Sequence, residues 1–507
     1  MATTTGEPGL TPMKFSRLTR RGVLLGLSGP QLVMASMASG TLIIGLYVGA
    51  VVMTFPIILL FVTLAFVGVG GRKLIEWAPI SARWLWRSAG GQLLYRRRVA
   101  KPRPAGTLAL PGDAARLRQW VDPETDAVMV HDPHAGTLTA VVGVSHPAFV
   151  LLDPAEQERR VVSWGRVLAT ACRSGRIASV QVMERTLPDS GKGLADWWEQ
   201  HGNRSGSWAS TTYGELVDRA GPAGERHAST VSISLDMKVA GRAIRAAGGG
   251  MRGAAAALRH EMATMLAALR SADLSPGEWL TTGDLALILR SAYDPAVAGA
   301  LERQGDIGRD LATAGPVAVT EAWGSLRSDS AHHCVLWISE WPRSLVYPGF
   351  LAPLLLSSGI RRTFTLLYTP MRSDRAARDI RKKKTEYISD AAQRQKIGQI
   401  EDAQQTAEYQ DVLQQEADLT AGHGVLRATG FVAVSASDPD ELERAVAAIE
   451  QATIQASCET RRLWGQQARP SPQERCRSVV SARDSRPPPG QALSQSPPYT
   501  PYSFSPT

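Results

Sequence analysis

Glycines beside a lysine could hold a nucleotide phosphate, because a glycine loop lets backbone N–H groups approach the phosphate oxygens closely. The chain has one Gly-Lys pair, Gly191-Lys192. A Walker loop also needs a glycine five residues before Gly191, and Thr186 stands there. We therefore expect no nucleotide hydrolysis by this chain.

A second glycine pattern matches the G-x-G-x-x-G spacing of dinucleotide sites, at Gly248, Gly250 and Gly253. Such a site needs a strand before the glycines, whereas residues 239–247 are helix-like. We interpret these glycines as a flexible break between two helices.

Histidines and acidic residues could bind a metal ion at two places. His260-Glu261 begins like the helix of a zinc protease, but the second ligand position, four residues after His260, is Thr264. The other group comprises His131, Asp132, His134 and His146. These residues surround turns such as the one at Asp132-Pro133, and there is no C-x-x-C pair. Neither group indicates a metal site.

Two nucleophile patterns also fail. His332 and His333 precede Cys334, which could form a thiol and base pair, but Cys334 begins an apolar strand, where cysteine behaves as a small hydrophobic residue. Gly143-Val-Ser145 lacks the closing glycine of a nucleophile elbow. We assign no catalytic, cofactor-binding or metal-binding residue and expect that the protein is not an enzyme.

The elements around these residues include one segment of unusual composition. Residues 22–71 contain no Asp, Glu, Lys or Arg. A spanning helix needs about 20 apolar residues, so the segment predicts two membrane spans, residues 31–47 and 51–69, with a turn at Gly49-Ala50. A signal peptide would have a shorter apolar run. A buried core hairpin would not leave fifty residues without a charge.

The positive charge of the chain flanks this segment. The chain has 507 residues and a net charge of +9, of which residues 1–21 carry +3 and residues 72–103 carry +8. The rest therefore sums to about −2. By the positive-inside rule, both ends of the hairpin lie in the cytoplasm, and the protein is expected in the cell (inner) membrane as a two-pass protein.

Residues 72–104 combine these cations with Trp77, Trp84 and Trp86. Aromatic rings favour the headgroup layer and cations favour anionic lipids, which predicts a basic, Trp-rich helix on the inner leaflet followed by a short, stiff linker. A nucleic-acid groove with stacking aromatics is the alternative.

A first β-α-β pattern follows the linker. A strand is expected at residues 137–144 and another at residues 177–183. Between them, Asp153 is a good N-cap, Pro154 suits the first helical position and Glu156 completes a capping box. Apolar residues recur at helical spacing at Val161, Trp164, Leu168 and Cys172.

A similar pattern recurs near the C-terminus. Strands are expected at residues 426–435 and 453–458, and Asp438 and Glu441 repeat the cap. The buried stripe is Leu442, Val446 and Ile449. Two such units predict an α+β body built from ferredoxin-like halves.

The sequence between the two units is expected to be helical over residues 225–301, with strands at residues 334–340 and 363–368. A long polar helix is expected over residues 373–419, basic in its first half and acidic in its second. Its basic residues include Arg375, Arg378, Arg381, Lys382, Lys383 and Lys384, and its acidic residues include Glu401, Asp402, Glu408, Asp411, Glu416 and Asp418. This segment is either a solvated helical hairpin whose arms attract each other or a docking arm for a partner.

The arrangement resembles an actinobacterial two-helix membrane-protein family associated with integrative and conjugative elements. The resemblance covers about residues 15–468 and rests on Gly29-Pro-Gln-Leu32, Pro102-Arg-Pro-Ala-Gly-Thr-Leu-Ala-Leu-Pro-Gly112, His131-Asp-Pro-His-Ala-Gly-Thr-Leu-Thr-Ala140, Ser339-Glu-Trp-Pro342 and Cys458-Glu-Thr-Arg-Arg-Leu463. The hairpin looks like the PrgI-type subunit of type IV secretion, and the body is similar to the non-ATPase region of the conjugation ATPase. The resemblance implies a translocation scaffold whose ATPase is a separate subunit, and it implies no catalytic residue.

The C-terminal tail departs from the family pattern. Members end soon after Gly465-Gln-Gln-Ala468 in an Ala- and Leu-rich stretch, whereas Arg469 begins a Pro-, Ser- and Arg-rich tail here. With a suitable choice of codons, reading two bases later gives Ala-Phe-Ala-Ala-Gly-Ala-Leu-Pro-Leu-Gly-Arg, the expected kind of ending. We expect residues 469–507 to be a disordered frameshift product, either natural or artefactual.

These patterns predict an α+β membrane protein with seven segments. They are an N-terminal cytoplasmic arm (1–21), two transmembrane helices (22–71), a basic juxtamembrane helix and linker (72–104), a first α+β unit (105–224), a helical region (225–315), a second α+β unit with the long helical arm (316–468), and the tail (469–507). The expected function is that of a non-enzymatic scaffold in a conjugative, type IV-like DNA-transfer or secretion apparatus. A membrane subunit of a type VII-like secretion system is the alternative. A membrane-bound enzyme is a third class, against which the missing motifs count.

The expected partners are lipids with anionic headgroups, a separate secretion or conjugation ATPase, other channel subunits and further copies of the chain. No cofactor is expected. Strong direct binding of nucleic acid is not expected either, because the basic arm is followed by acidic sequence that can neutralise it.

Overall fold

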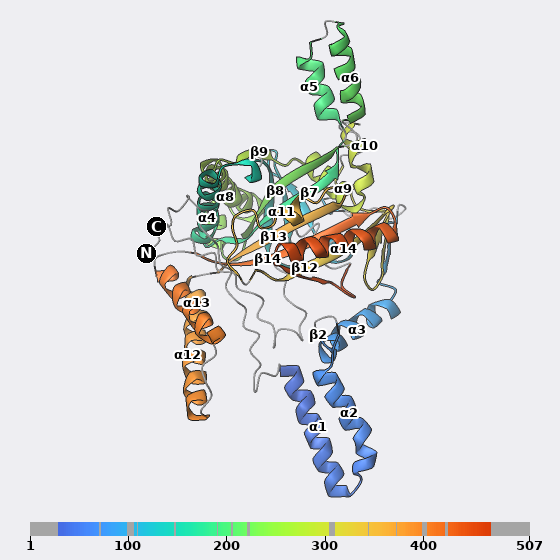
Figure 1. Ribbon diagram of the computed structural model, residues 1–507. Coiled ribbons are helices and arrows are strands. Elements are labelled where there is room, and N and C mark those ends of the chain that lie inside the picture. The colour runs from blue at the N-terminus through green and yellow to red at the C-terminus, as the bar shows by residue number, and fades with distance from the viewer. Residues whose placement is uncertain are drawn as a thin grey trace, which may run out of the picture. The chain divides into compact units, whose positions relative to one another are not determined.

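The structure is a computed structural model, drawn in Figure 1. It describes residues 29–69, 72–98, 106–108, 110–146, 149–189, 191–203, 206–220, 224–303, 310–342, 344–371, 373–397, 403–420 and 424–467. The expected N-terminal arm and the expected disordered tail lie outside these residues. The described chain divides into two compact units, one within residues 29–93 and one within residues 94–467.

The first unit contains a hairpin of two apolar helices, α1 (Gly29–Val48) and α2 (Val51–Phe66). Gly49 makes the turn with a φ of 71°, a left-handed conformation that glycine adopts readily. The helices pack antiparallel: Gln31 Nε2 donates a hydrogen bond to Ala65 O (2.8 Å), and a Cβ at Gly45 would lie 2.3 Å from Thr54 Oγ1. The two expected helices are therefore present.

The second helix is shorter than the expected span. It ends at Phe66, and Gly68–Val69 (β1) pairs with Arg72–Lys73 (β2) in a small antiparallel ribbon. Of the described helices, α1 alone is long and apolar enough to cross a membrane by itself, whereas α2 has 16 residues. The expected span at residues 51–69 is corrected to residues 51–66.

A second short helix, α3 (Leu74–Ala89), follows the ribbon. It carries Glu76 in its first turn and Arg87 in its last turn, which suits the helix dipole. The chain then forms β3 (Leu94–Arg96), which pairs with a strand of the body, so the end of the expected juxtamembrane helix is a strand.

Within the described residues of the body, thirteen strands form one sheet, in which all pairs are antiparallel. Its peripheral strands are β3, β4 (Arg118–Val121), β5 (Val128–Asp132), β10 (Ala318–Glu321) and β11 (Leu326–Ser328). Short helices connect them to the rest: η1 (Gly112–Arg116), α9 (Thr282–Tyr293), η4 (Pro295–Val297) and α10 (Ala298–Arg303).

The first half of the body is a β-α-β-β-α-β succession with an insertion. Its elements are β6 (Thr137–Ser145), η2 (Phe149–Leu151), α4 (Pro154–Ser174), β7 (Ile177–Pro188), α5 (Lys192–His201), α6 (Trp208–Ala220), β8 (Glu225–Asp236), α7 (Gly241–Ala246), α8 (Gly250–Ser271) and β9 (Ser275–Trp279). The strands lie in the order β9-β6-β8-β7, and α5 and α6 are inserted between β7 and β8. The prediction of helix over residues 225–301 is therefore wrong for residues 225–236, which form the central strand β8, and for residues 275–279, which form β9.

The second half repeats this succession. Its elements are β12 (Ala331–Glu340), α11 (Ala352–Leu355), β13 (Arg361–Met371), α12 (Ser373–Ile397), α13 (Ala403–Thr420), β14 (Val425–Ala436), α14 (Pro439–Gln455) and β15 (Glu459–Arg462). The strand order is β15-β12-β14-β13, and α12 and α13 are inserted at the same topological position as α5 and α6. The strand expected at residues 453–458 is corrected, because α14 continues to Gln455 and β15 begins at Glu459.

The two halves join through β7 and β13. These strands pair antiparallel from Arg185 opposite Thr363 to Val180 opposite Tyr368. The sheet is therefore continuous from one half to the other, and the order of strands on one side of this joint mirrors the order on the other.

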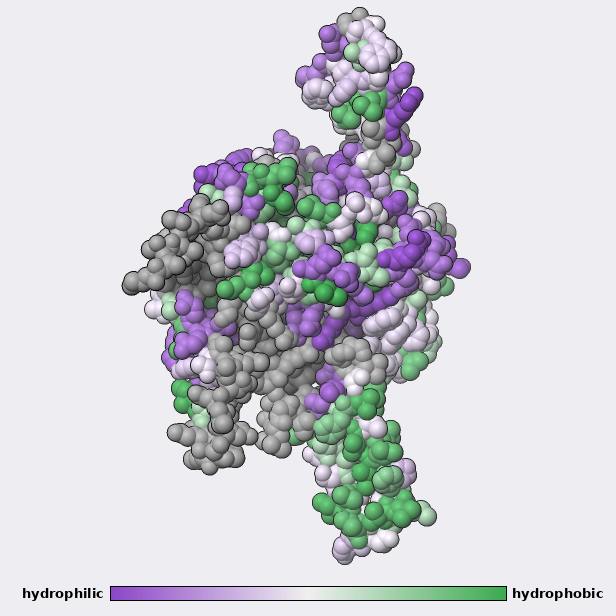
Figure 2. All heavy atoms as spheres, viewed as in Figure 1, coloured by the Kyte–Doolittle hydropathy of each residue, from purple (hydrophilic) through white to green (hydrophobic). Residues whose placement is uncertain are grey.

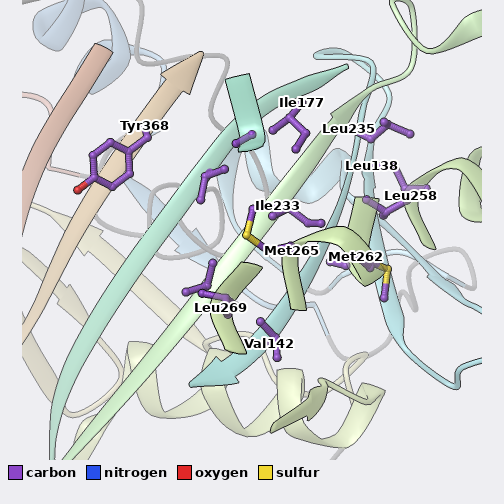
Figure 3. Close-up of a cluster of buried hydrophobic side chains, with 14 of the residues drawn as sticks. Leu138, Val142, Ile177, Ile233, Leu235, Leu258, Met262, Met265, Leu269 and Tyr368 are labelled. Atoms are coloured by element: carbon purple, nitrogen blue, oxygen red, sulfur yellow. The ribbon is translucent and has the colours of Figure 1, made fainter. Parts of the chain in front are cut away.

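The core of the first half lies between the sheet and helices α4 and α8. Leu258, Met262, Met265 and Leu269 follow one another at spacings of four, three and four on α8, so they share one face and point at the strands (Figure 3). Leu138, Val142, Ile233 and Leu235 of β6 and β8 meet them. In the second half, α14 covers β12 and β14 with Leu442, Val446 and Ile449, the stripe expected from the sequence.

Both expected helix caps are present, although neither forms a reciprocal capping box. Asp153 accepts from Glu156 N, but the Glu156 carboxylate accepts from Arg160 Nε (2.8 Å). Asp438 accepts from the N–H groups of its own helix, whereas Glu441 accepts from the Ser437 N–H. The caps still position α4 and α14 at the start of their crossovers.

Candidate interaction surfaces

The four residues around His131 do not converge. Asp132 pairs with Thr137 at one end of β6, and His146 follows the other end, so nine residues at about 3.3 Å each place them roughly 30 Å apart. Asp132 Oδ1 instead accepts from His134 N (2.9 Å) and Ala135 N (3.1 Å), which closes the turn. Among the described residues, no group of three potential ligands could hold a metal ion.

The zincin-like pair serves the packing of α8. The buried Glu261 carboxylate lies 3.2 Å from Arg176 Nε, and the Thr264 hydroxyl donates to His260 O. The glycines before this helix make the expected break, with φ values of 95°, 74° and 59° at Gly248, Gly249 and Gly250. Both features are structural.

The residues of the two nucleophile patterns lie on strands, and this placement does not suit a nucleophile. Cys334 lies in the core beneath α14, and His333, one residue earlier, faces the opposite side of the sheet. Burial raises the pKa of Cys334 to about 12, which disfavours the thiolate. Ser145 ends β6 opposite Ser275 of β9, so it lies on a paired strand end and not on a strand-to-helix elbow.

His333 is fully buried in a hydrogen-bonded network. Its Nε2 lies 2.9 Å from Tyr293 O and 2.7 Å from Ser328 Oγ, and its Nδ1 lies 2.8 Å from Ser435 Oγ. Ser328 Oγ donates to Tyr293 O (2.5 Å), so an N–H at Nε2 is shared by Tyr293 O and Ser328 Oγ, which leaves Nδ1 to accept from Ser435 Oγ. The residue expected as a base therefore ties β12 to β14 and to the end of α9.

A polar cluster that sequence reasoning missed lies where β6 ends beside β8, on residues of β7 and β8. Ser229 donates to Glu184, His146 Nε2 lies 3.2 Å from Ser229 Oγ, and His227 Nδ1 lies 3.5 Å from Glu184 Oε1. The Ser229 hydroxyl already donates its proton to a carboxylate, so it is not arranged for attack with His146 as the base. The sequence signal for this cluster is the two-residue spacing of His227 and Ser229, which places both side chains on one face of a strand.

The apolar hairpin presents a large hydrophobic surface. Tyr47 and Val52 are about nine-tenths exposed, and most other large side chains of α1 and α2 are exposed as well. Figure 2 shows mostly hydrophobic residues over these helices on the face in view. Soluble monomers rarely expose such a surface, so it indicates burial in lipid or against another protein. Helix α3 adds Leu85 and Trp86, which are also exposed.

The polar arm is the hairpin α12–α13, as expected. Lys384 Nζ lies 2.7 Å from Glu416 Oε2, and Tyr387 stacks obliquely on Tyr409. A hydrogen bond from Lys384 to Glu416 raises the pKa of this lysine. Ile380, Tyr387 and Val412 are buried between the two helices. The arms therefore attract each other, while Arg375, Arg378 and Arg381 of α12 remain exposed.

A second helical hairpin, α5–α6, was not singled out from the sequence. Trp198 and Tyr213 hold its two helices together, with ring centroids 4.7 Å apart. Trp208 is 82% exposed, and Trp197, stacked on His201, is 52% exposed. The adjacent tryptophans Trp197 and Trp198, in a segment bounded by Gly191 and Gly202, were the signal that could have identified it.

A scan against protein-family models and a search of curated proteins gave no match to this chain.

Proposed function

We propose that this protein is a non-enzymatic membrane scaffold of a conjugative, type IV-like DNA-transfer apparatus. In this proposal, the hairpin α1–α2 lies in the cell membrane and both ends of the chain lie in the cytoplasm. The body would then present its helical arms to other subunits, including a separate ATPase and further copies of the chain. The hairpin resembles the PrgI-type subunit, and this resemblance connects it to type IV transfer.

The observation that carries the membrane part is the exposed, uncharged surface of α1–α2. Residues 29–66 contain no ionisable Asp, Glu, Lys or Arg side chain, and polar groups such as Gln31, Ser36 and Thr41 donate to backbone carbonyls. In lipid, each backbone and side-chain donor must be satisfied within the protein, and these groups meet that requirement. Helix α2 has 16 residues, fewer than the about 20 that a single span needs. Because it packs closely against α1, the two helices can cross the membrane together as one hairpin.

The repeated strand order supports the scaffold part. Each half follows β-α-β-β-α-β connectivity with the order 4-1-3-2, and we propose that both halves are ferredoxin-like units. Such halves provide a rigid sheet from which inserted hairpins can reach partners. A type VII-like secretion subunit, which also combines two spans with a cytoplasmic body, is the alternative.

Loss of the gene should separate these two functions. Deleting it from a donor that carries the transfer apparatus should abolish DNA transfer to recipient cells, and expression of the intact chain should restore it. Secretion of small helical proteins should not change. The type VII alternative predicts the opposite pair of results, and unchanged DNA transfer together with lost protein secretion would replace the proposal with it.

We also expect the body to bind DNA weakly. Residues 106–467 carry a net charge of −5, and the Lys384–Glu416 pair shows acidic α13 neutralising basic α12. Because phosphate neutralisation supplies most non-specific affinity, a fragment with these residues should have a Kd above about 10 µM for duplex DNA in 150 mM salt. Fluorescence anisotropy measures it. Submicromolar, steeply salt-dependent binding would mean that the body handles DNA directly.

A further inference from the structure

The two inserted hairpins leave the sheet at opposite ends. Hairpin α5–α6 follows the end of β7 at Pro188, and hairpin α12–α13 follows the end of β13 at Met371. The antiparallel register of these strands puts Pro188 level with Ile360, eleven residues from Met371, or about 36 Å along the sheet. The hairpins (Figure 1) therefore start too far apart for their bases to meet within one chain.

The exposed surface of α5–α6 suits arginine. Trp208 is largely exposed, and Trp197 exposes aromatic surface beside its stack with His201. Glu215 and Asp218 lie exposed on the same hairpin, with Glu215 in an exposed pair with Arg219 (3.6 Å). Figure 2 shows apolar and strongly hydrophilic residues next to each other over these helices. A guanidinium group can stack on an indole ring and at the same time bind a carboxylate through two N–H groups. A surface of rings and carboxylates is therefore complementary to a row of arginines.

Helix α12 carries such a row. Arg375, Arg378 and Arg381 follow one another at a spacing of three and are all exposed. Ile388 continues the stripe seven residues after Arg381 and is 56% exposed. Helix α12 has eight basic and four acidic residues, whereas α5 and α6 together have four acidic and two basic residues. The two arms are thus complementary both in charge and in the type of side chain.

We propose that the arginine stripe of α12 docks on the aromatic and acidic face of α5–α6 of a second copy of this chain. Because the two arms differ and lie at opposite ends of the sheet, the contact is head-to-tail, and repetition closes a ring or extends a filament. The inference rests on the proposed membrane scaffold, in which copies of the chain lie side by side. It identifies the surfaces that join them.

A charge-swap experiment on the full chain in detergent tests the contact. Molar mass is measured by light scattering after size exclusion. The parent should be oligomeric. The triple variant Arg375→Glu, Arg378→Glu, Arg381→Glu should weaken association by at least tenfold, as should the double variant Glu215→Lys, Asp218→Lys. A one-to-one mixture of these two variants should restore association, because the unreversed α12 of the double variant can meet the unreversed α5–α6 of the triple variant, and the two reversed arms are again opposite in charge.

The matched control reverses three exposed arginines on α4, Arg159→Glu, Arg166→Glu and Arg173→Glu, and should keep the parent mass. A monomeric parent, an unchanged mass in either arm variant, or a mixture that stays dissociated would overturn the proposal. Each variant is first checked for an unchanged circular dichroism melt.

Cross-linking gives a second measurement of the contact, for the case that a charge-reversal variant misfolds and its molar mass no longer reports on the contact. A chain with both Trp208→Cys and Arg378→Cys should form covalent multimers with a short bismaleimide, and either single variant should form fewer. Absence of multimers from the double variant contradicts the contact. A different partner on either arm, such as an ATPase, would leave the purified chain monomeric. These experiments measure association of the chain and not DNA transfer. A failure of the proposed contact can therefore be told apart from a failure of the proposed function.

Discussion

Deleting residues 29–66 should release the protein from the membrane. These helices contain eighteen Leu, Ile, Val and Phe residues, which at the centre of a span favour insertion by roughly 5–11 kcal/mol in total. The intact chain should stay in the membrane pellet after extraction at high pH, and the deletion variant should enter the supernatant. The remaining helix α3 has 16 residues and exposes Leu85 and Trp86, so it can lie on the membrane surface but is too short to span, and it should not resist this extraction.

The control for this deletion removes α5–α6, residues 192–220, which leaves the apolar hairpin in place. That variant should remain in the pellet. If the chain without residues 29–66 still resists extraction, another segment anchors it. The proposed membrane role of α1–α2 would then be withdrawn.

The same hairpin gives a labelling test of orientation. A cysteine at Ala50, in the turn, should react with an impermeant maleimide added to intact cells, and a cysteine at Ser88, at the end of α3, should react only after lysis. Ala50 is a better site than Gly49, whose φ of 71° disfavours other residues. Labelling of Ser88→Cys but not of Ala50→Cys in intact cells would show that the hairpin has the opposite orientation.

The apolar hairpin α1–α2 was the most predictable element. A long run without charge leaves few alternatives, and the predicted helices at residues 31–47 and 51–69 differ from α1 and α2 by at most three residues at each end. The end of α2 was missed because an apolar strand can follow an apolar helix without a change of composition. The helix caps Asp153 and Asp438 were predictable for a similar reason, since an N-cap is a local interaction.

Strand β8 shows where local reasoning failed. Val231, Ile233 and Leu235 alternate with serines and threonine, which is the two-residue period of a strand. The high helix propensity of the alanine-rich sequence that follows dominates the prediction for the whole region. The neighbours that stabilise β8 are β6 and β7, which lie more than 35 residues away in sequence, so no local window contains them.

The pairing of β7 with β13 could not be predicted either. Arg185 and Thr363 are opposite each other although 178 positions separate them, and nothing in either strand specifies its partner. The same limit applies to the interaction surfaces. The charges of α12 were visible in the sequence, but their complement on α5–α6 becomes apparent only when both hairpins are seen as equivalent insertions.

Replacing the buried His333 with alanine should destabilise the body more than the same change at its neighbour His332. The alanine variant removes the imidazole N–H that Tyr293 O and Ser328 Oγ share and the acceptor for Ser435, and it leaves a cavity between β12, β14 and α9. An unmade buried hydrogen bond costs about 1–3 kcal/mol and the cavity adds to it, so we expect a loss of about 3 kcal/mol in the free energy of unfolding. The midpoint of urea unfolding, monitored by circular dichroism, measures it.

A double-mutant cycle shows whether the loss comes from the network. Ser435→Ala alone should cost about 1 kcal/mol, since it leaves Nδ1 of His333 without this donor. Combined with His333→Ala, it should add almost nothing, which gives a coupling energy of about 1 kcal/mol. The control His332→Ala, on the opposite face of the strand, should stay within about 1 kcal/mol of the parent. Fully additive losses would mean that His333 acts by filling space, and the hydrogen-bonded role assigned to it would be wrong.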